Sequence, residues 1–393
     1  MNKNNQKPKI VRIFSRLNIG GPSLQVTLLS EALSPHYDTV LVTGAVEKIE
    51  GDMSYLIQKP THFRHHFISE LGRNVQFGKD IIAFWKIFCL LKREKPLVVH
   101  THTSKAGVLG RIAAFLAGVP VIVHTFHGHV FEGYYGRIKS CVIIFLERSL
   151  AFFSSKIIAI SLKQRDDLVM RFRVAGFHKV SVIPLGFNLA PFYENNTDTT
   201  SARKNLGLPL HSYCIGIVGR LVPIKNHHFF LKICKEISVI RKDVHFVIVG
   251  DGECYSSLIQ QVKYFNLEER ISFLGWQKNM PLVYRAFDIV MLTSLNEGTP
   301  VSLIEAQASA CPVIASRVGG TEDVVSSGKT GYVLPVHEKK AFVEAIAELL
   351  ENDDKRRRMG DEGRELMKKK FDQINLVSNV SHLYSDLLKE KYL

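Results

Sequence analysis

The sequence lacks several features that would assign it to particular classes of protein. It has no apolar run of about 18 residues or more, which is the length that a bilayer-spanning helix needs. Its six cysteines are scattered and none forms a Cys-x-x-Cys pair, so they read as core thiols of a reducing compartment, without a metal framework. The first residues are polar and lead directly into a strand, so we expect no cleavable signal and a cytoplasmic protein.

Acidic residues are scarce relative to basic ones, mainly in the first half of the chain. The net charge is +14, and residues 1–200 contain 25 Lys and Arg against 14 Asp and Glu, an excess of +11. A basic half predicts an anionic partner such as a lipid phosphate, an acidic glycan or a membrane surface. There is no zinc finger, RNA-recognition signature or basic stripe interleaved with aromatic residues, so we expect no nucleic acid.

Strand-like and helix-like segments alternate through both halves of the 393 residues, which predicts parallel sheets covered by helices on both faces. The polar stretch around 194–200 interrupts this alternation. We therefore expect an α/β protein of two Rossmann-like domains. The expected bounds are 1–190 for the acceptor-binding domain, 191–207 for a linker, 208–371 for the nucleotide-binding domain and 372–393 for a final helix.

The most informative segment runs from Glu297 to Glu305, two acids that bracket a strand-to-helix turn. We expect a helix from Val301 onward, with Thr299 as N-cap and Pro300 in the first helical position. A helix that starts where a parallel strand ends binds anions, and carboxylates beside it can accept hydrogen bonds from a diol. This favours a ligand with both phosphate and hydroxyl groups; the alternative is a helix with one solvated acid.

Two further strand exits carry residues suited to phosphate. Arg220 and Lys225 follow the first strand of the second half and can converge on a diphosphate, although an ordinary surface cation pair is the alternative. Gly20 and Gly21 lie between the first strand and the first helix, where the backbone can approach a ligand closely. A structural turn would use the same two glycines.

These motifs resemble those of retaining glycosyltransferases of family 4, which have the GT-B fold of two facing Rossmann-like lobes and a last helix that crosses back to the first lobe. The resemblance covers nearly the whole chain and includes the Glu-x7-Glu motif, the Gly-Arg…Lys-Gly element with Asn226 in place of glycine, and the His-x-x-His-Gly element ending at His127 and Gly128. The stretch 182–188 resembles the family's Pro-Asn-Gly-Val-Asp hinge, with Leu185 and Asn188 as departures.

The resemblance implies a role for each matched residue. Glu305 would hold the donor's ribose, Glu297 the donor sugar, and His127 the sugar face nearest the acceptor. Arg220, Lys225 and the turn formed by Gly298, Thr299, Pro300 and Val301 would stabilise the departing diphosphate, which Gly20 and Gly21 would also touch. No Asp-x-Asp pair is present, so we expect neither a metal nor another cofactor.

Histidines and one apolar helix complete the set of candidates. His100, His102 and Lys105 follow a neighbouring strand, and we expect them to form a wall of the acceptor pocket; a zinc site lacks matching ligands. The basic, apolar segment 136–148 predicts a helix that docks on an anionic membrane, with a buried packing helix as the alternative.

We therefore predict a retaining, metal-independent glycosyltransferase. It would move a sugar from a nucleoside-diphosphate donor, which we expect to be UDP-linked, to a glycan or lipid-phosphate acceptor in polysaccharide or glycolipid synthesis. It would be cytoplasmic and peripheral on the inner face of the membrane. Two rivals remain: an isomerase resembling UDP-sugar 2-epimerases, and a non-catalytic scaffold that binds sugar nucleotides.

Overall fold

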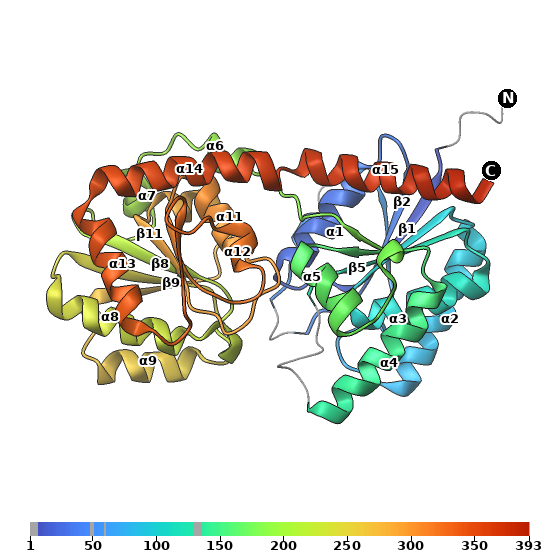
Figure 1. Ribbon diagram of the computed structural model, residues 1–393, viewed down its shortest axis with the longest axis horizontal. Coiled ribbons are helices and arrows are strands. Elements are labelled where there is room, and N and C mark those ends of the chain that lie inside the picture. The colour runs from blue at the N-terminus through green and yellow to red at the C-terminus, as the bar shows by residue number, and fades with distance from the viewer. Residues whose placement is uncertain (1–6, 48–50, 59, 129–135, 393) are drawn as a thin grey trace. The chain divides into compact units, whose positions relative to one another are not determined.

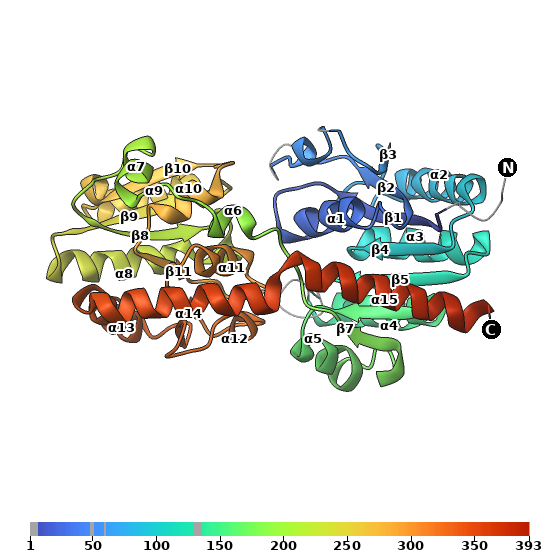
Figure 2. The same cartoon turned by 90° about the horizontal axis from the view of Figure 1, so that it is seen from above.

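The chain folds into two compact units, each a parallel α/β domain, in a computed structural model that describes residues 7–47, 51–58, 60–128 and 136–392 (Figures 1 and 2). The first unit combines Met1–Phe187 with Gln373–Leu393, and the second comprises Asn188–Asp372. The chain leaves the first unit at Asn188, inside the stretch expected to act as a hinge. The last helix therefore belongs to the same unit as the first strand.

The sheet of the first unit has seven parallel strands in the order β3-β2-β1-β4-β5-β6-β7. Most strand residues are buried, because helices cover both faces of the sheet, although the edge strand β3 is polar and largely exposed. The strands are β1 (Lys9–Arg16), β2 (Asp38–Gly44), β3 (Arg64–Phe67), β4 (Val98–His102), β5 (Val121–Phe126), β6 (Lys156–Ala159) and β7 (Val180–Val182).

Helices form two layers on this sheet. Alternate residues of β1 separate the layers: Ile10 packs with α1 and α15, whereas Val11 packs with α2 and α3. The α4 helix lies beside α3 in the second layer (Figure 1). The bounds are α1 (Gly21–Ala32), α2 (Phe77–Glu94), α3 (Ser104–Ala117), α4 (Arg137–Phe153) and α15 (Gln373–Tyr392), with the short α5 (Leu162–Asp166) continuing into a π-helical turn.

A buried polar cluster fastens α15 to the sheet. The Tyr384 hydroxyl lies 2.6 Å from Nδ1 of His100 and accepts a hydrogen bond from Arg12 at 3.4 Å. All three side chains are fully buried. Burial lowers the pKa of His100 well below its usual value, so this imidazole is neutral. The final helix is thus an integral part of the first unit's core.

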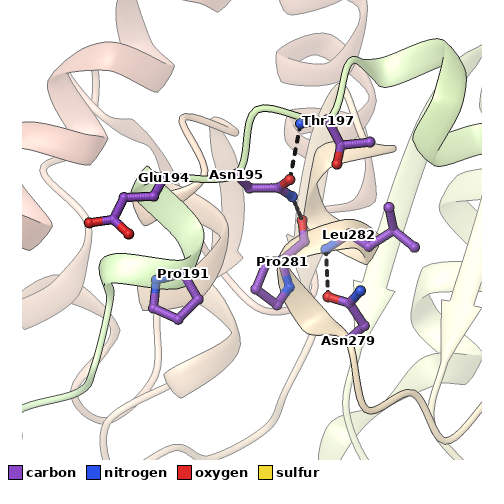
Figure 3. Close-up of a pocket in the computed structure, with 7 residues that line it drawn as sticks. All are labelled: Pro191, Glu194, Asn195, Thr197, Asn279, Pro281 and Leu282. Carbon is purple, nitrogen blue, oxygen red and sulfur yellow. Dashed lines mark hydrogen bonds between the residues drawn. The ribbon is translucent and has the colours of Figure 1, made fainter.

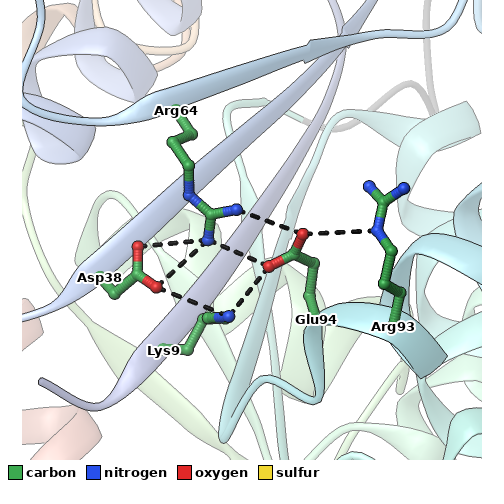
Figure 4. Close-up of polar contacts among 5 residues, drawn as sticks. All are labelled: Lys9, Asp38, Arg64, Arg93 and Glu94. Carbon is green, nitrogen blue, oxygen red and sulfur yellow. Dashed lines mark hydrogen bonds and ion pairs between the residues drawn. The ribbon is translucent and has the colours of Figure 1, made fainter. Parts of the chain in front are cut away.

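An ion network lies at the amino ends of β1, β2 and β3 (Figure 4). Arg64 contacts Asp38 at 3.1 Å and Glu94 at 3.0 Å, and Lys9 contacts Glu94 at 2.9 Å. The hydrogen bond from Arg64 is the main reason why the pKa of Glu94 falls to about 2. The network joins the strand starts to the end of α2, and Arg93 adds a longer contact to Glu94 at 3.6 Å.

The second unit has a six-stranded parallel sheet in the order β10-β9-β8-β11-β12-β13. Its core lies between the sheet and helices α8, α9, α13 and α14. The strands are β8 (Tyr213–Val218), β9 (Val244–Val249), β10 (Ile271–Gly275), β11 (Ile289–Leu292), β12 (Val313–Ser316) and β13 (Gly331–Leu334). The helices include α8 (His227–Ile240), α9 (Tyr255–Tyr264), α10 (Met280–Arg285), α11 (Val301–Ala308), α12 (Thr321–Val324), α13 (Lys339–Glu351) and α14 (Asp353–Phe371).

The expected linker 191–207 is wrong, because this stretch folds as part of the second unit. It contains α6 (Ala190–Tyr193) and α7 (Thr199–Asn205), and α7 is capped by the Asp198 side chain. Arg203 of α7 is buried and forms a 2.6 Å ion pair with Asp288. The polar composition reflects this capping and pairing, which a composition argument cannot distinguish from a solvated linker.

Candidate functional site

The second sheet has a topological switch point at β8, whose neighbours β9 and β11 lie on opposite sides. The chain therefore leaves β8 and β11 in divergent directions, and ligands of such sheets bind in the crevice that this creates. Hydrogen bonds join the two exit loops: Leu295 N donates to Ile224 O at 2.8 Å, and the Thr293 hydroxyl donates to the carbonyl of Asn226 at 3.0 Å. The predicted phosphate and sugar residues lie on these loops.

Lys225 and Glu297 meet across the switch point. The Lys225 ammonium lies 2.5 Å from Oε1 of Glu297, and the Ser294 hydroxyl donates to the same oxygen at 2.6 Å. The Glu297 side chain is only 8% exposed, whereas that of Lys225 is 22% exposed. The pair holds a cation and an acceptor oxygen together at a partly buried edge, where hydrogen bonds to charged groups are strong.

Arg220 follows β8 directly and is half-buried. Within the described part of the chain, its guanidinium has no hydrogen bond or ion pair. Its loop packs closely on the exit of β9: a Cβ on Gly250, at φ +130°, would lie 2.0 Å from the carbonyl oxygen of Gly219. The glycine-rich stretch after β9 therefore serves turn geometry and leaves Arg220 available for an anion.

Asn226 begins α8 in the left-handed conformation, with φ 53° and ψ 43°. Asparagine adopts this conformation more readily than most residues other than glycine, which suits it to the position where the family has glycine. Its side chain, however, makes no capping hydrogen bond.

The turn before α11 differs from its prediction by one residue. Pro300 occupies the N-cap position and Val301 is the first helical residue, so the expected cap by Thr299 is wrong. No side-chain capping bond is formed there. A Cβ on Gly319, at φ +48°, would lie 1.7 Å from the Glu297 carbonyl oxygen, and one on Gly320 would lie 2.0 Å from that of Gly298. Two glycines after β12 thus allow a loop to support this turn closely.

Glu305 lies on α11 without a basic partner among the described residues. The Tyr284 hydroxyl donates to its Oε2 at 3.0 Å. Burial raises the pKa of Glu305 to about 7, although the hydrogen bond from Tyr284 opposes this shift. The residue as a whole is only half-buried, so a ligand can still reach it. Hydroxyl groups that donate hydrogen bonds to Glu305 would stabilise its ionised form.

In the first unit, Gly20 ends the loop after β1 and Gly21 is the first residue of α1. His127 follows β5, and its Nε2 lies 3.0 Å from Nδ1 of His102. Burial lowers the pKa of His127 to about 3, so the ring is neutral near pH 7. One proton is shared in this contact, and Nδ1 of His127 is buried without a hydrogen-bond partner among the described residues; it is a donor or an acceptor according to the tautomer.

The expectation that His100, His102 and Lys105 form a wall of the acceptor pocket is wrong. His100 and His102 are fully buried, and Lys105 forms a 2.5 Å ion pair with Asp80. The reason is that β4 is a central strand, so its side chains enter the core below α3 and α15. Among the described residues, no group of three or more His, Cys, Asp or Glu side chains is arranged to hold a metal ion.

Sequence reasoning missed a strained residue at the first unit's own switch point, between β1 and β4. Thr103 has φ 65° and ψ 158°, which is rare for a β-branched residue. Its hydroxyl lies 2.7 Å from that of Ser15, at the end of β1. No residue-type signal marks such strain in a single sequence.

A pocket of about 260 Å³ in the second unit lies away from the predicted residues (Figure 3). Its amide side chains already make hydrogen bonds within its lining: Asn195 donates to Pro281 O at 3.0 Å, and Asn279 accepts from Leu282 N at 3.4 Å. It therefore offers little polar recognition, and the switch point remains the candidate site.

Comparisons with known proteins identify the family of the chain. Residues 19–190 match Glycosyltransferase Family 4, and residues 198–366 match Glycosyl transferases group 1. The chain is 34% identical to the UDP-Gal:alpha-D-GlcNAc-diphosphoundecaprenol alpha-1,3-galactosyltransferase of Escherichia coli, covering 84% of this chain and 85% of that protein. It is 27% identical to the capsular polysaccharide biosynthesis glycosyltransferase CapM of Staphylococcus aureus, covering 88% and 90%.

Solved structures support the fold. The crystal structure of Anabaena Alr3699/HepE in complex with UDP and glucose superimposes with a TM-score of 0.83 over 96% of this chain and 99% of that one, at 21% identity. Sucrose-phosphate synthase from Thermosynechococcus elongatus gives a TM-score of 0.83 over 98% and 100%, also at 21% identity. The predicted GT-B fold is confirmed, and the chain belongs to the family 4, group 1 glycosyltransferases.

Proposed function

We propose that the protein is a retaining, metal-independent glycosyltransferase that uses a UDP-sugar and a lipid-linked glycan acceptor in cell-surface polysaccharide or glycolipid synthesis. The observation that carries the proposal is the meeting of Lys225 and Glu297 at the switch point, with Arg220 and Glu305 on the same edge of the sheet. The Escherichia coli relative suggests UDP-galactose as the first donor to test. It likewise suggests a diphosphoundecaprenol-linked N-acetylglucosamine as the first acceptor.

In this proposal the second unit binds the donor. Arg220 and Lys225 neutralise the diphosphate, and the start of α11 adds backbone N–H groups. Because Lys225 already contacts Glu297, a diphosphate would draw on a cation that is held in place before the ligand arrives. Preorganised donors of this kind each contribute about 3–4 kcal/mol to stabilising developing charge.

Glu305 would accept hydrogen bonds from the ribose diol, and Glu297 would accept from the donor sugar. His127, neutral because of its burial, would contact the sugar face nearest the acceptor, and Gly20 and Gly21 would touch the donor phosphate. Retention of anomeric configuration and independence from metal are part of the proposal and rest on the family resemblance. We place the reaction on the cytoplasmic side, where nucleotide sugars are made.

The first experiment is a transfer assay with UDP-galactose, UDP-glucose and UDP-N-acetylglucosamine against a short-chain analogue of the lipid-linked acceptor. We expect an α-linked product, identified by its anomeric proton coupling, and undiminished activity in EDTA. A β-linked product would refute retention. Formation of an epimerised sugar or UDP-sugar without acceptor would favour the isomerase, and donor binding with no turnover would favour the scaffold.

The two cations supply a sharper test. Arg220→Ala and Lys225→Ala should each lower kcat at least about a hundredfold. The double variant should lose less than the product of the two, since both side chains act on one diphosphate. Lys204→Ala, an exposed cation on α7 of the same unit, is the matched control and should leave kcat unchanged. Full additivity would mean that Arg220 and Lys225 serve separate sites.

A further inference from the structure

The outward face of α4 is largely apolar, which reverses the usual pattern of a surface helix. Among the described side chains of α4, exposed residues recur at helical spacing along its whole length, and most of them are apolar; the exceptions are Lys139, Arg148 and Ser149. The fractional exposure reaches 83% at Ile138, 71% at Phe145 and 77% at Phe152. The exposed apolar residues are Ile138, Cys141, Val142, Phe145, Leu146 and Phe152.

The inward face of α4 contains the group that a surface helix would normally expose. Glu147 is buried and forms a 2.7 Å ion pair with Arg111 of α3, which is also buried. This pair fixes the rotation of α4 about its axis. Turning the apolar side chains inward would carry Glu147 to the surface and break its buried ion pair with Arg111. The exposed apolar face is therefore a defined feature of the fold.

The α2 helix of the same layer adds a second exposed apolar group near its start. Phe77 is 83% exposed and Trp85 is 56% exposed, with Ile81 and Ile82 between them at 44% and 47%. Helices α2, α3 and α4 cover one face of the first sheet, so the outward sides of α2 and α4 both point away from it (Figure 1). We call these two exposed groups the α2/α4 face.

The charge around the α2/α4 face is positive. Helices α2, α3 and α4 contain nine Lys and Arg against three Asp and Glu. All three acids are already paired: Asp80 with Lys105, Glu94 with the network at the strand starts, and Glu147 with Arg111. Lys79 and Lys139 are exposed beside the apolar residues.

We propose that the α2/α4 face docks on the surface of an anionic lipid bilayer. Amphipathic helices with aromatic residues on one side and lysines at the border lie in the headgroup region, where apolar burial and charge attraction act together. A second copy of the chain fits less well, because a two-fold contact would set two strongly basic surfaces against each other. In the described residues, no helix is long and apolar enough to cross a bilayer.

The apolar residues, rather than Arg148, carry this docking. Arg148 donates to the carbonyl of Phe172 at 2.8 Å, so its charge is already engaged within the unit. Docking does not depend on the proposed transfer chemistry, and the two can fail separately.

Vesicle sedimentation of the full-length protein tests the proposal. Vesicles of phosphatidylcholine with about a third phosphatidylglycerol are compared with vesicles of phosphatidylcholine alone, at low and high salt. Phe145→Gln with Phe152→Gln removes two exposed aromatic side chains without touching the core. Val239→Gln with Ile240→Gln, at comparably exposed positions on α8 of the other unit, is the matched control.

We expect the wild-type protein to bind the anionic vesicles at least tenfold more tightly than the neutral ones. The Phe145/Phe152 variant should bind at least tenfold more weakly, and the α8 control should behave as wild type. Lys79→Gln with Lys139→Gln should weaken binding at low salt and matter less at high salt, because exposed charges are then screened. In a Trp276→Phe background, the emission of Trp85 should shift to shorter wavelength on the anionic vesicles.

Several results would overturn the proposal. These are absence of binding to anionic vesicles, equal binding by the Phe145/Phe152 variant, and loss of a dimer of the protein in that variant instead of loss of vesicle binding. UDP-sugar affinity of the same variant should stay unchanged. If that affinity is lost as well, the variant is misfolded, and Ile138→Gln with Val142→Gln then replaces it as the deciding test.

Discussion

Donor binding should depend on pH through Glu305, whose pKa is about 7 in the free protein. If Glu305 holds the ribose, the diol donates to the ionised carboxylate, so binding is coupled to loss of a proton. The ionised fraction falls from about ten elevenths at pH 8 to about one eleventh at pH 6. The apparent Kd for a UDP-sugar should therefore rise about tenfold over this range, equivalent to about 1.4 kcal/mol.

Isothermal titration with UDP-galactose from pH 5.5 to 8.5 measures this directly. A nucleotide sugar suits the test because its diphosphate is esterified at both ends, so it has no monoester phosphate with a pKa near 6. Titrations at pH 7 in two buffers with different ionisation enthalpies should show release of about half a proton per donor bound.

Two variants separate Glu305 from other titrating groups. Glu305→Gln should bind more weakly at pH 8 and show a flat pH profile. Tyr284→Phe removes the hydrogen bond that lowers the pKa of Glu305, so the midpoint of the profile should move to higher pH. Equal affinity at pH 6 and 8 in the wild-type protein would refute the reasoning, and so would a pH dependence that survives in Glu305→Gln.

Three further predictions concern stability and can be checked by chemical or thermal denaturation. Glu94→Gln should destabilise the protein by about 1 kcal/mol at pH 7, since the partners of Glu94 are partly solvated. Because the pKa of Glu94 is lowered, this loss of stability should shrink as pH falls from 4.5 toward 2. A loss of stability that does not change with pH would contradict the prediction. Glu147→Gln should cost about 3–5 kcal/mol by leaving Arg111 buried and unpaired, whereas replacing both by Leu and Met should be nearly neutral. Tyr384→Phe should cost about 1–3 kcal/mol because His100 loses a buried partner, and an unchanged midpoint would show that water replaces it.

The sequence predicts most of the strands and the residues that follow them well, because both depend on local residue type. Buried parallel strands are apolar runs, and the residues that follow them share one edge of the sheet, so Arg220, Lys225 and Glu297 could be expected to lie together. The structure places Lys225 against Glu297 and leaves Arg220 unpaired among the described residues. The roles assigned to these residues stay predictions.

What the sequence could not predict depends on contacts between distant segments. The edge strands β3 and β13 are short, and β3 is polar, so neither stands out in a hydrophobic pattern. The pKa of Glu305 depends on burial and on Tyr284, twenty-one positions earlier. Periodicity in α4 reveals an apolar stripe but cannot say which way it faces, since a buried stripe and an exposed one have the same spacing.

The burial of α15 against the first sheet affects how this protein emerges from the ribosome. Leu376, Val380 and Tyr384 complete a hydrophobic core whose other members include Ile10 and Val98. During synthesis, that core must wait until the α15 segment has been made, whereas the second unit, Asn188–Asp372, is contiguous and can fold as soon as it leaves the tunnel. The half made first is therefore finished last, and a nascent chain truncated before residue 373 would expose an uncovered sheet face to chaperones and proteases.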